Sequence, residues 1–153
     1  MVPALKELWR KGISVMANIL IVDSYSSVGL LYREVLEERG HRVFIALSGK
    51  EAVLFGLHED IDIAVVDDKL FDLEAEELLR KLKLLQPHIQ SILSISSTFV
   101  SPINPRLWGA IFIKTHDFRV LESEVERICH KSTSTVSPVL KENEKQEIAS
   151  SYD

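Results

Sequence analysis

Apolar residues along this chain fall into short continuous runs, separated by segments in which they recur every three or four positions. A continuous run predicts a strand that is buried on both faces, whereas the spaced pattern predicts a helix with one apolar side. The predicted strands occupy residues 18–22, 42–46, 63–66, 91–95 and 110–113. Strand and helix patterns therefore succeed each other along the chain.

Local signals set the limits of several predicted helices. Gly40 follows the first helix and is expected to end it, because glycine adopts the backbone conformation of a helix terminus easily. Ser48 and Glu51 have the spacing of a capping box and predict the start of the second helix. Residues 97–109 contain two prolines, so this segment is expected to hold only a short or broken helix.

Five strand-then-helix units predict a parallel sheet, because only a crossover helix returns the chain to start another parallel strand. Right-handed crossovers then place helices on both faces of the sheet. The expected fold is a three-layer, doubly wound α/β sandwich with a five-stranded parallel sheet. In such folds ligands bind beyond the carboxyl ends of the strands.

The pattern divides the chain into three parts. Residues 1–17 predict a short amphipathic helix, either a loosely packed extension or a segment that docks on a partner or a membrane surface. Residues 18–130 form the predicted domain. Residues 131–153 are rich in serine, threonine, glutamate and lysine, and are expected to form a flexible tail because they carry too few apolar side chains to fold.

Composition narrows the class of protein. The 153 residues carry a net charge of −5, which argues against a nucleic-acid-binding surface. The single cysteine, Cys129, excludes an internal disulfide. No apolar run approaches the roughly 18 residues of a membrane span, and the start of the chain lacks a signal peptide. We therefore expect a cytoplasmic protein.

Polar side chains directly follow four of the predicted strands: Asp23, Asp67, Ser96 and Lys114. These side chains are expected to converge, because the carboxyl ends of parallel strands meet at one edge of the sheet. Two neighbouring carboxylates repel unless a cation or a proton lies between them, and Mg²⁺ suits such oxygen ligands. A carboxylate can also form an acyl phosphate, with the lysine and the hydroxyl holding the phosphoryl oxygens.

Several segments, in this order, resemble the receiver domain of two-component response regulators. They are NILIVD at 18–23, ALSGKEAV at 46–53, IAVVD at 63–67 followed by EELLRKLK at 76–83, and FIK at 112–114. The resemblance covers residues 18–130 and implies the flavodoxin-like strand order 2-1-3-4-5.

The resemblance also implies a role for each residue at the strand ends. Asp67 corresponds to the phosphoacceptor, which receives phosphate from a histidine kinase or a phosphotransfer protein. Asp23 and Asp67 correspond to Mg²⁺ ligands. Ser96 corresponds to the hydroxyl switch, although the register leaves Ser97 as an alternative, and Lys114 corresponds to the phosphate counter-ion.

This sequence departs from the pattern of the family at several positions. Ser24 stands where the family has a second acid, so Mg²⁺ affinity should be weakened. Thr115 replaces a cis-proline, and Ile111 replaces the aromatic switch. Further differences are Phe71 for proline and Ala75 for glycine, while Asp68 adds an acid where the family tolerates many residues. These differences describe a partly degenerate receiver.

Three functions are compatible with these residues. The first is a stand-alone receiver that is phosphorylated on Asp67 and acts through protein contacts. The second is a degenerate receiver that is not phosphorylated and serves as a constitutive interaction module. The third, an enzyme that uses Asp67 as a hydrolytic nucleophile, ranks last because no substrate pocket is visible. We therefore expect a signalling module and not an enzyme.

The acids just after Asp67 have a simpler interpretation. Asp72, Glu74, Glu76 and Glu77 are expected to form the solvated first turn of the next helix, where negative charge is favourable to the helix dipole.

Overall fold

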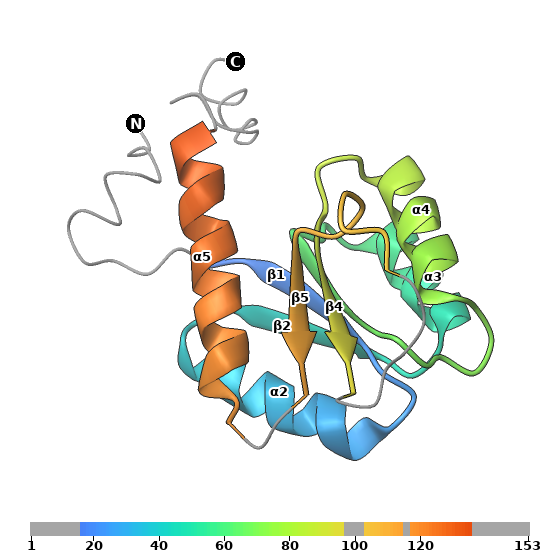
Figure 1. Cartoon of the computed structure of the whole chain (residues 1–153), viewed down its shortest axis with the longest axis horizontal. Coiled ribbons are helices and arrows are strands. Elements are labelled where there is room, and N and C mark those ends of the chain that lie inside the picture. The colour runs from blue at the N-terminus through green and yellow to red at the C-terminus, as the bar shows by residue number, and fades with distance from the viewer. Residues whose placement is uncertain (1–15, 97–102, 115–116, 136–153) are drawn as a thin grey trace. The chain divides into compact units, whose positions relative to one another are not determined.

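A computed structural model of the chain describes residues 16–96, 103–114 and 117–135. Figure 1 shows its helices and strands in sequence order. They are β1 Asn18–Val22, α2 Ser26–Glu38, β2 Arg42–Ala46, α3 Gly49–His58, β3 Ile63–Asp67, α4 Ala75–Leu85, β4 Gln90–Ile95, β5 Ala110–Ile113 and α5 Arg119–Thr135.

The chain separates into two compact units, one of residues 16–124 and the other of residues 1–15 together with 125–153. The sheet lies wholly in the first unit. The helix predicted in residues 1–17 falls almost entirely outside the described residues. The predicted tail overlaps the end of α5, which continues to Thr135. None of the helices in the described part of the chain is long and apolar enough to cross a membrane.

Within the described residues, the strands form one five-stranded sheet in the order β2-β1-β3-β4-β5. Every neighbouring pair is parallel, which confirms the predicted fold. The register brings the ends of the strands level: Val22 lies opposite both Ala46 and Val66, and Asp67 lies opposite Ser94. The carboxyl ends of the strands therefore form one edge.

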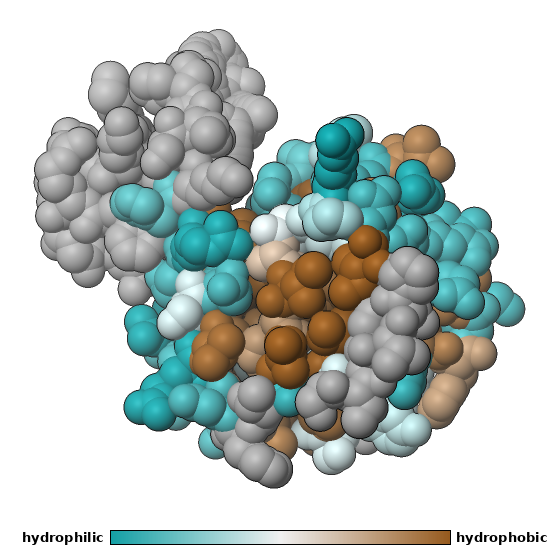
Figure 2. Space-filling model, viewed as in Figure 1, coloured by the Kyte–Doolittle hydropathy of each residue, from teal (hydrophilic) through white to brown (hydrophobic). Residues whose placement is uncertain are grey.

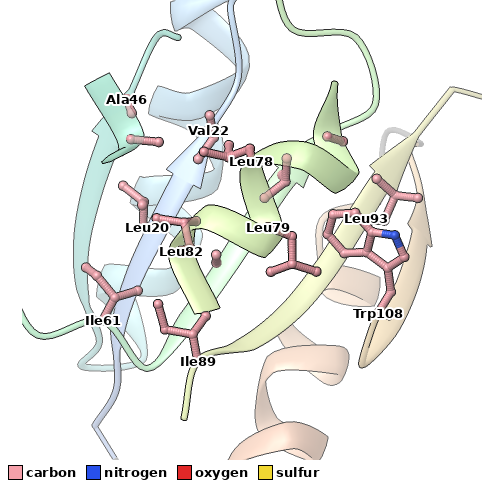
Figure 3. Close-up of a cluster of buried hydrophobic side chains, with 14 residues drawn as sticks. Leu20, Val22, Ala46, Ile61, Leu78, Leu79, Leu82, Ile89, Leu93 and Trp108 are labelled. Atoms are coloured by element: carbon pink, nitrogen blue, oxygen red, sulfur yellow. The ribbon is translucent and has the colours of Figure 1, made fainter. Parts of the chain in front are cut away.

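One face of the sheet is covered by α3 and α4. Alternate residues of β1, Leu20 and Val22, join a buried cluster with Leu78, Leu79 and Leu82 of α4 (Figure 3). A strand directs successive side chains to opposite faces, so this cluster uses every second residue of the central strands. The strongly amphipathic pattern of α4 is explained by this contact.

The opposite face of the sheet carries α2. A β-carbon on Gly29 of α2 would lie 3.2 Å from Cγ2 of Ile45, which shows how closely this helix approaches β2. The helix ends where the sequence predicts, since Gly40 has a φ of 93°. The amide of Gly40 donates to the carbonyl of Glu37 and that of His41 to Leu36. Helices on both faces complete the predicted three layers.

The polar side chain of Gln86 joins elements on the α3–α4 side. The amide of Gln86 accepts from the N–H of Ile61 and donates to the carbonyl oxygens of Gly56 and Glu59, at 2.7–2.9 Å. Because these backbone groups belong to loops and helix ends, one side chain satisfies three groups that have few other partners. Gln86 therefore fixes the end of α4 against the end of α3.

The start of α3 is held in a way that the sequence predicts only in part. Ser48 Oγ accepts from the N–H of Glu51, as expected for an N-cap. The Glu51 carboxylate accepts from Leu47, one residue before the position expected for a capping box. The Asp72 carboxylate accepts from the N–H groups of Gly49 and Lys50 at 2.8 and 2.9 Å. Asp72 therefore caps α3. It is exposed, as predicted, but it lies before α4 and not in the first turn of that helix.

The connection between β4 and β5 contains no helix in its described part. Residues 103–109 form a turn, with the amide of Leu107 donating to the carbonyl of Asn104. Figure 2 shows apolar side chains gathered on the face where β4 and β5 lie. Ile111 and Ile113 of β5 are 39% and 50% exposed. Residues 97–102, which include Ser97, lie outside the described part of the chain.

Candidate functional site

The four predicted site residues all lie at the carboxyl edge of the sheet. Asp23 follows β1, Asp67 ends β3, Ser96 follows β4 and Lys114 follows β5. Backbone hydrogen bonds continue the pairing of the strands to this edge: the amide of Asp23 donates to Ala46 at 3.1 Å, and that of Lys114 donates to Ile95 at 2.7 Å. The sheet itself therefore sets the spacing of these side chains.

Asp23, Asp67 and Lys114 form a buried charged group. Each aspartate is only 2% exposed. The Lys114 ammonium forms an ion pair with Oδ1 of Asp67 and lies 3.8 Å from Oδ2 of Asp23. The structure thus brings together three of the four residues from distant parts of the sequence, in the arrangement expected from the parallel strands.

Backbone amides orient both aspartates. Asp23 Oδ1 accepts from the N–H of Tyr25 at 2.9 Å, and Asp67 Oδ2 accepts from the N–H of Lys69 at 3.1 Å. In each case the carboxylate bonds to the residue two positions later, as aspartate does in turns. Each side chain is therefore held by the loop that follows its strand.

Burial and neighbouring charges together shift the pKa values of Asp23 and Lys114. Burial raises the pKa of Asp23, and the charge of Asp67 raises it further, whereas the hydrogen bond from Tyr25 and the charge of Lys114 oppose the shift. Burial alone would lower the pKa of Lys114, but the hydrogen bond and charge of Asp67 and the charge of Asp23 raise it overall. Lys114 therefore remains an ammonium ion at neutral pH.

Asp68 is a third acid at this edge, which the sequence marked as an added acid without assigning it a site role. Both of its carboxylate oxygens are buried, and they have no hydrogen-bond partner among the described residues. Burial raises the pKa of Asp68, and the charge of Asp67 adds to this effect. The only sequence signal was its position beside Asp67, which does not reveal whether the side chain is solvated.

Two serines, Ser24 and Ser96, lie at this edge of the sheet. Ser96 is half-buried directly after β4, beside the residue whose carbonyl accepts from Lys114. Ser97 and Thr115 lie outside the described residues, so the choice between Ser96 and Ser97 and the peptide before Thr115 stay as predictions. Ser24 Oγ is buried and has no hydrogen-bond partner within the described part of the chain.

An aromatic cluster beneath Lys114 was also missed in the sequence. Tyr32 of α2 is 2% exposed, and its ring contacts those of Phe112 and Phe118, with centroids 6.1 and 5.6 Å apart. Burial raises the pKa of Tyr32, so its hydroxyl is neutral at physiological pH. Its helical spacing with Leu36 could have indicated a core residue, but its place beside the charged group depends on the fold.

The loop after Asp67 is attached to its neighbours on two sides. The rings of Phe71 and Tyr25 contact edge to face with centroids 5.9 Å apart, and both side chains are exposed. Asp72 binds the start of α3 as described above. The loop that contributes Lys69 to the site is therefore fixed between α3 and the loop after β1.

The donor set fits Mg²⁺ only with help from other ligands. Among the described residues, no group of three or more acidic, histidine or cysteine side chains is arranged to hold a metal. Asp23 and Asp67 provide two carboxylates, and Mg²⁺ commonly binds one or two carboxylates together with water and phosphate oxygens. The site therefore suits an Mg²⁺ ion that completes its coordination with water and a phosphoryl group.

Comparison with known proteins agrees with this geometry. No family model matches the chain. The sporulation initiation phosphotransferase F of Bacillus subtilis (strain 168) is 29% identical over 76 residues, which are 50% of this chain and 61% of that protein. The match thus spans less than two thirds of the curated relative.

Solved structures extend the similarity over most of the chain. A CheY-like response regulator receiver domain from Methanospirillum hungatei JF-1 is 26% identical, with a TM-score of 0.71, and the match covers 78% of this chain and 98% of that one. The response regulator TrrA from Thermotoga maritima, solved with Mg²⁺ and BeF, is 22% identical, with a TM-score of 0.67 and coverage of 74% and 99%. The fold and these similarities confirm that the chain resembles the receiver domains of two-component response regulators.

Proposed function

We propose that this chain is a phosphoacceptor receiver domain of a two-component phosphorelay, phosphorylated on Asp67. The observation that carries the proposal is the position of Asp67 at the carboxyl edge of β3, 2% exposed and paired with the Lys114 ammonium. A carboxylate in such a place can act as a nucleophile, and a fixed cation beside it can neutralise a transferred phosphoryl group.

The reaction that this geometry supports is a simple displacement at phosphorus. A carboxylate oxygen of Asp67 attacks the phosphorus of a phosphohistidine, a P–O bond forms and the P–N bond breaks. The imidazole leaves with the electron pair and takes a proton from water. The N–H of Lys69 holds the other carboxylate oxygen, and Lys114 turns from the carboxylate toward the phosphoryl oxygens.

Asp23 and Asp67 are the residues that would hold Mg²⁺. The bound cation would neutralise negative charge on the phosphoryl oxygens during transfer. Ser24 contributes a hydroxyl where a carboxylate would bind more strongly, so we propose a weakened site. Ser96 is proposed as the hydroxyl that contacts the phosphoryl group.

The proposed partners follow from the chemistry. A histidine kinase or a phosphotransfer protein would supply the phosphohistidine, in line with the similarity to a sporulation phosphotransferase. We propose that the signal then passes onward through protein contacts. No nucleic-acid contact is proposed, because the net charge is −5.

A second candidate is a degenerate receiver that binds partners without phosphorylation. Ser24 in place of a second acid after Asp23 favours it, and so does Ile111, which is 39% exposed where an aromatic switch residue is expected. The two candidates share a fold and differ in whether Asp67 reacts.

Incubation with acetyl phosphate and Mg²⁺, followed by intact mass measurement, separates these candidates. Attack by Asp67 breaks the P–O bond of acetyl phosphate and releases acetate, so the wild-type protein should gain the mass of one phosphoryl group. Asp67→Asn should gain none, whereas Asp60→Asn, which removes an exposed acid, should react like wild type.

Two other outcomes have clear meanings. A folded wild-type protein that gains no phosphoryl group at high Mg²⁺ and binds no beryllofluoride would support the degenerate receiver. Continuous release of phosphate over many turnovers would instead indicate an enzyme.

A further inference from the structure

One aromatic ring contacts the chain on both sides of Lys114. We infer that Tyr32 is a positioning residue for the proposed phosphoryl transfer: its ring braces the connection from β5 to α5 and thereby holds the Lys114 ammonium against Asp67. This role rests on the proposed function, since Tyr32 acts on the reaction through Lys114.

The ring of Tyr32 contacts two phenylalanines that flank Lys114 in the sequence. Phe112 belongs to β5 and precedes Lys114 by two positions, whereas Phe118 follows it by four and directly precedes α5. Both contacts are edge to face, with interplanar angles of 75° and 74°. Tyr32 and Phe112 are buried. One side chain of α2 therefore connects the end of β5 to the start of α5 (Figure 1).

Lys114 depends on a fixed backbone because its side chain reaches across the sheet. β4 lies between β3 and β5, and neighbouring strands are about 4.8 Å apart, so the ammonium approaches Asp67 across two such spacings. The stem of a lysine is flexible. The ammonium pairs with Asp67 and lies 3.8 Å from Oδ2 of Asp23. A shift of the end of β5 would therefore move the ammonium out of place.

The backbone of Lys114 is paired with the sheet on one side. Its amide donates to the carbonyl of Ile95 at 2.7 Å, which continues the pairing of β5 with β4. β5 is the last strand of the sheet, so no strand among the described residues pairs with its outer side. The contact of Tyr32 with Phe112 adds support from the face of the sheet that carries α2. Phosphoryl transfer depends mainly on positioning and on neutralisation of charge, so this support should affect the rate.

Tyr32→Leu keeps an apolar side chain in the core and removes both ring contacts. The amide of Lys114 should then exchange with solvent roughly tenfold faster, as expected for the loss of two aromatic contacts. The initial rate of phosphoryl uptake from acetyl phosphate with Mg²⁺ should fall by roughly tenfold, because a small displacement of a positioned group slows a reaction strongly. Tyr32→Phe retains the ring and should behave like wild type. Phe118→Leu removes one contact and should give an intermediate effect.

The matched control is Phe55→Leu, which removes a ring contact on the other face of the sheet. The rings of Phe55 and Phe44 have centroids 5.4 Å apart, and both side chains pack against the apolar cluster beneath α3 and α4. This variant also exchanges a partly buried aromatic residue for leucine. It should leave both the exchange at Lys114 and the rate of phosphoryl uptake unchanged.

Amide exchange measured by NMR shows whether the effect is local. The amides of Asp23 and Asp68 donate to neighbouring strands at the same edge of the sheet and serve as references within each protein. In Tyr32→Leu we expect faster exchange at Lys114 and unchanged exchange at both references. A side chain that only stabilises the whole fold would change all three amides together.

Each other outcome has a definite meaning. Unchanged exchange at Lys114 in Tyr32→Leu, or equal acceleration at all three amides, would overturn the inference. Phosphoryl uptake as fast as wild type in Tyr32→Leu, or a Tyr32→Phe protein as altered as Tyr32→Leu, would also overturn it. A wild-type protein that accepts no phosphoryl group would overturn the proposed function, whereas the exchange pattern tests the bracing of Lys114 without any phosphoryl transfer.

Discussion

Two consecutive residues of β3 are both buried but lie in different surroundings, one apolar and one charged. Val66 is 0% exposed and Asp67 is 2% exposed. Val66 belongs to the apolar cluster beneath α3 and α4, whereas Asp67 belongs to the charged group with Asp23 and Lys114. Burial stabilises the protein in the first case, whereas in the second it raises the pKa of the neighbouring Asp23.

The two surroundings differ in how burial affects stability. The apolar side is closely packed, since a β-carbon on Gly56 would lie 2.9 Å from Leu82. The carboxyl edge has acids whose pKa values are raised, mainly by burial, at Asp23 and Asp68. Removal of a buried apolar side chain should therefore lower stability, whereas removal of a buried acidic charge at the carboxyl edge should raise it without metal, and the following predictions test that contrast.

The largest effect on stability is expected on the apolar side. Leu79→Ala should lower the free energy of unfolding by about 2–5 kcal/mol, because Leu79 is fully buried and its removal leaves a cavity. Leu84 lies on the same helix and is 84% exposed, so Leu84→Ala should change the free energy by less than about 0.5 kcal/mol. Urea unfolding of both variants measures this, and equal losses would contradict the described core.

A smaller effect is expected from removal of the buried cation. Lys114→Met leaves Asp67 and Asp23 without their positive neighbour, and should cost up to about 3 kcal/mol at neutral pH, less than for a fully buried pair. The loss should shrink as the pH falls and Asp23, whose pKa is raised by burial, takes up a proton. Lys81→Met, at an exposed position of α4, is the control. A Lys114→Met protein as stable as that control would contradict the ion pair.

Asp23→Asn should raise the stability of the protein in the absence of metal, whereas Lys114→Met should lower it. Burial, reinforced by the charge of Asp67, raises the pKa of Asp23 above its ordinary value of 3.8. The folded state therefore holds a proton that the unfolded state has lost, and wild-type stability falls as the pH rises through the folded pKa. The asparagine cannot ionise, so the variant should be more stable at neutral pH, and this difference should disappear near pH 3.8.

With Mg²⁺ present, the wild-type protein should be more stable than Asp23→Asn. A ligand that binds only the folded state at 100 times its Kd stabilises it by about 2.7 kcal/mol, and the asparagine variant should gain much less. Denaturant unfolding across pH, with chelator and then with Mg²⁺, measures both effects. An Asp23→Asn protein that is less stable than wild type in chelator at neutral pH would contradict the raised pKa.

The smallest effect is expected at Asp72. Hydrogen bonds from Gly49 and Lys50 lower the pKa of this exposed carboxylate below 3.8. Its contribution to stability is therefore present at neutral pH and is lost as the pH falls through the folded pKa. Asp72→Ala should lower the melting temperature slightly at pH 7 and should speed amide exchange at Gly49 and Lys50. Unchanged exchange at both amides would show that Asp72 does not cap α3.

Much of the fold could be predicted because its strands are continuous apolar runs with clear limits. The predicted strands at 18–22, 42–46 and 110–113 coincide with β1, β2 and β5, and the other two differ by one residue at an end. The convergence of Asp23, Asp67 and Lys114 followed from the parallel sheet, because each directly ends or follows a strand.

The remaining features depend on contacts between distant segments. Asp72 binds the start of α3, 22 and 23 residues earlier in the chain, and no local pattern distinguishes it from a solvated acid. The burial of Asp68 and Tyr32 depends on how loops and helices close around the edge of the sheet. The choice between Ser96 and Ser97 depends on the register of residues 97–109, which the sequence pattern does not fix because this segment contains two prolines.

The most direct test of the central claim is to locate the phosphoryl group. Wild-type protein treated with acetyl phosphate and Mg²⁺ is reduced with borohydride, which converts an aspartyl phosphate to homoserine, and the peptides are sequenced by mass spectrometry. We predict homoserine at position 67, dependent on Mg²⁺ and absent from Lys114→Met at the same reaction time. Homoserine at Asp23 or Asp68 instead, or at no acid of this edge, would contradict the account.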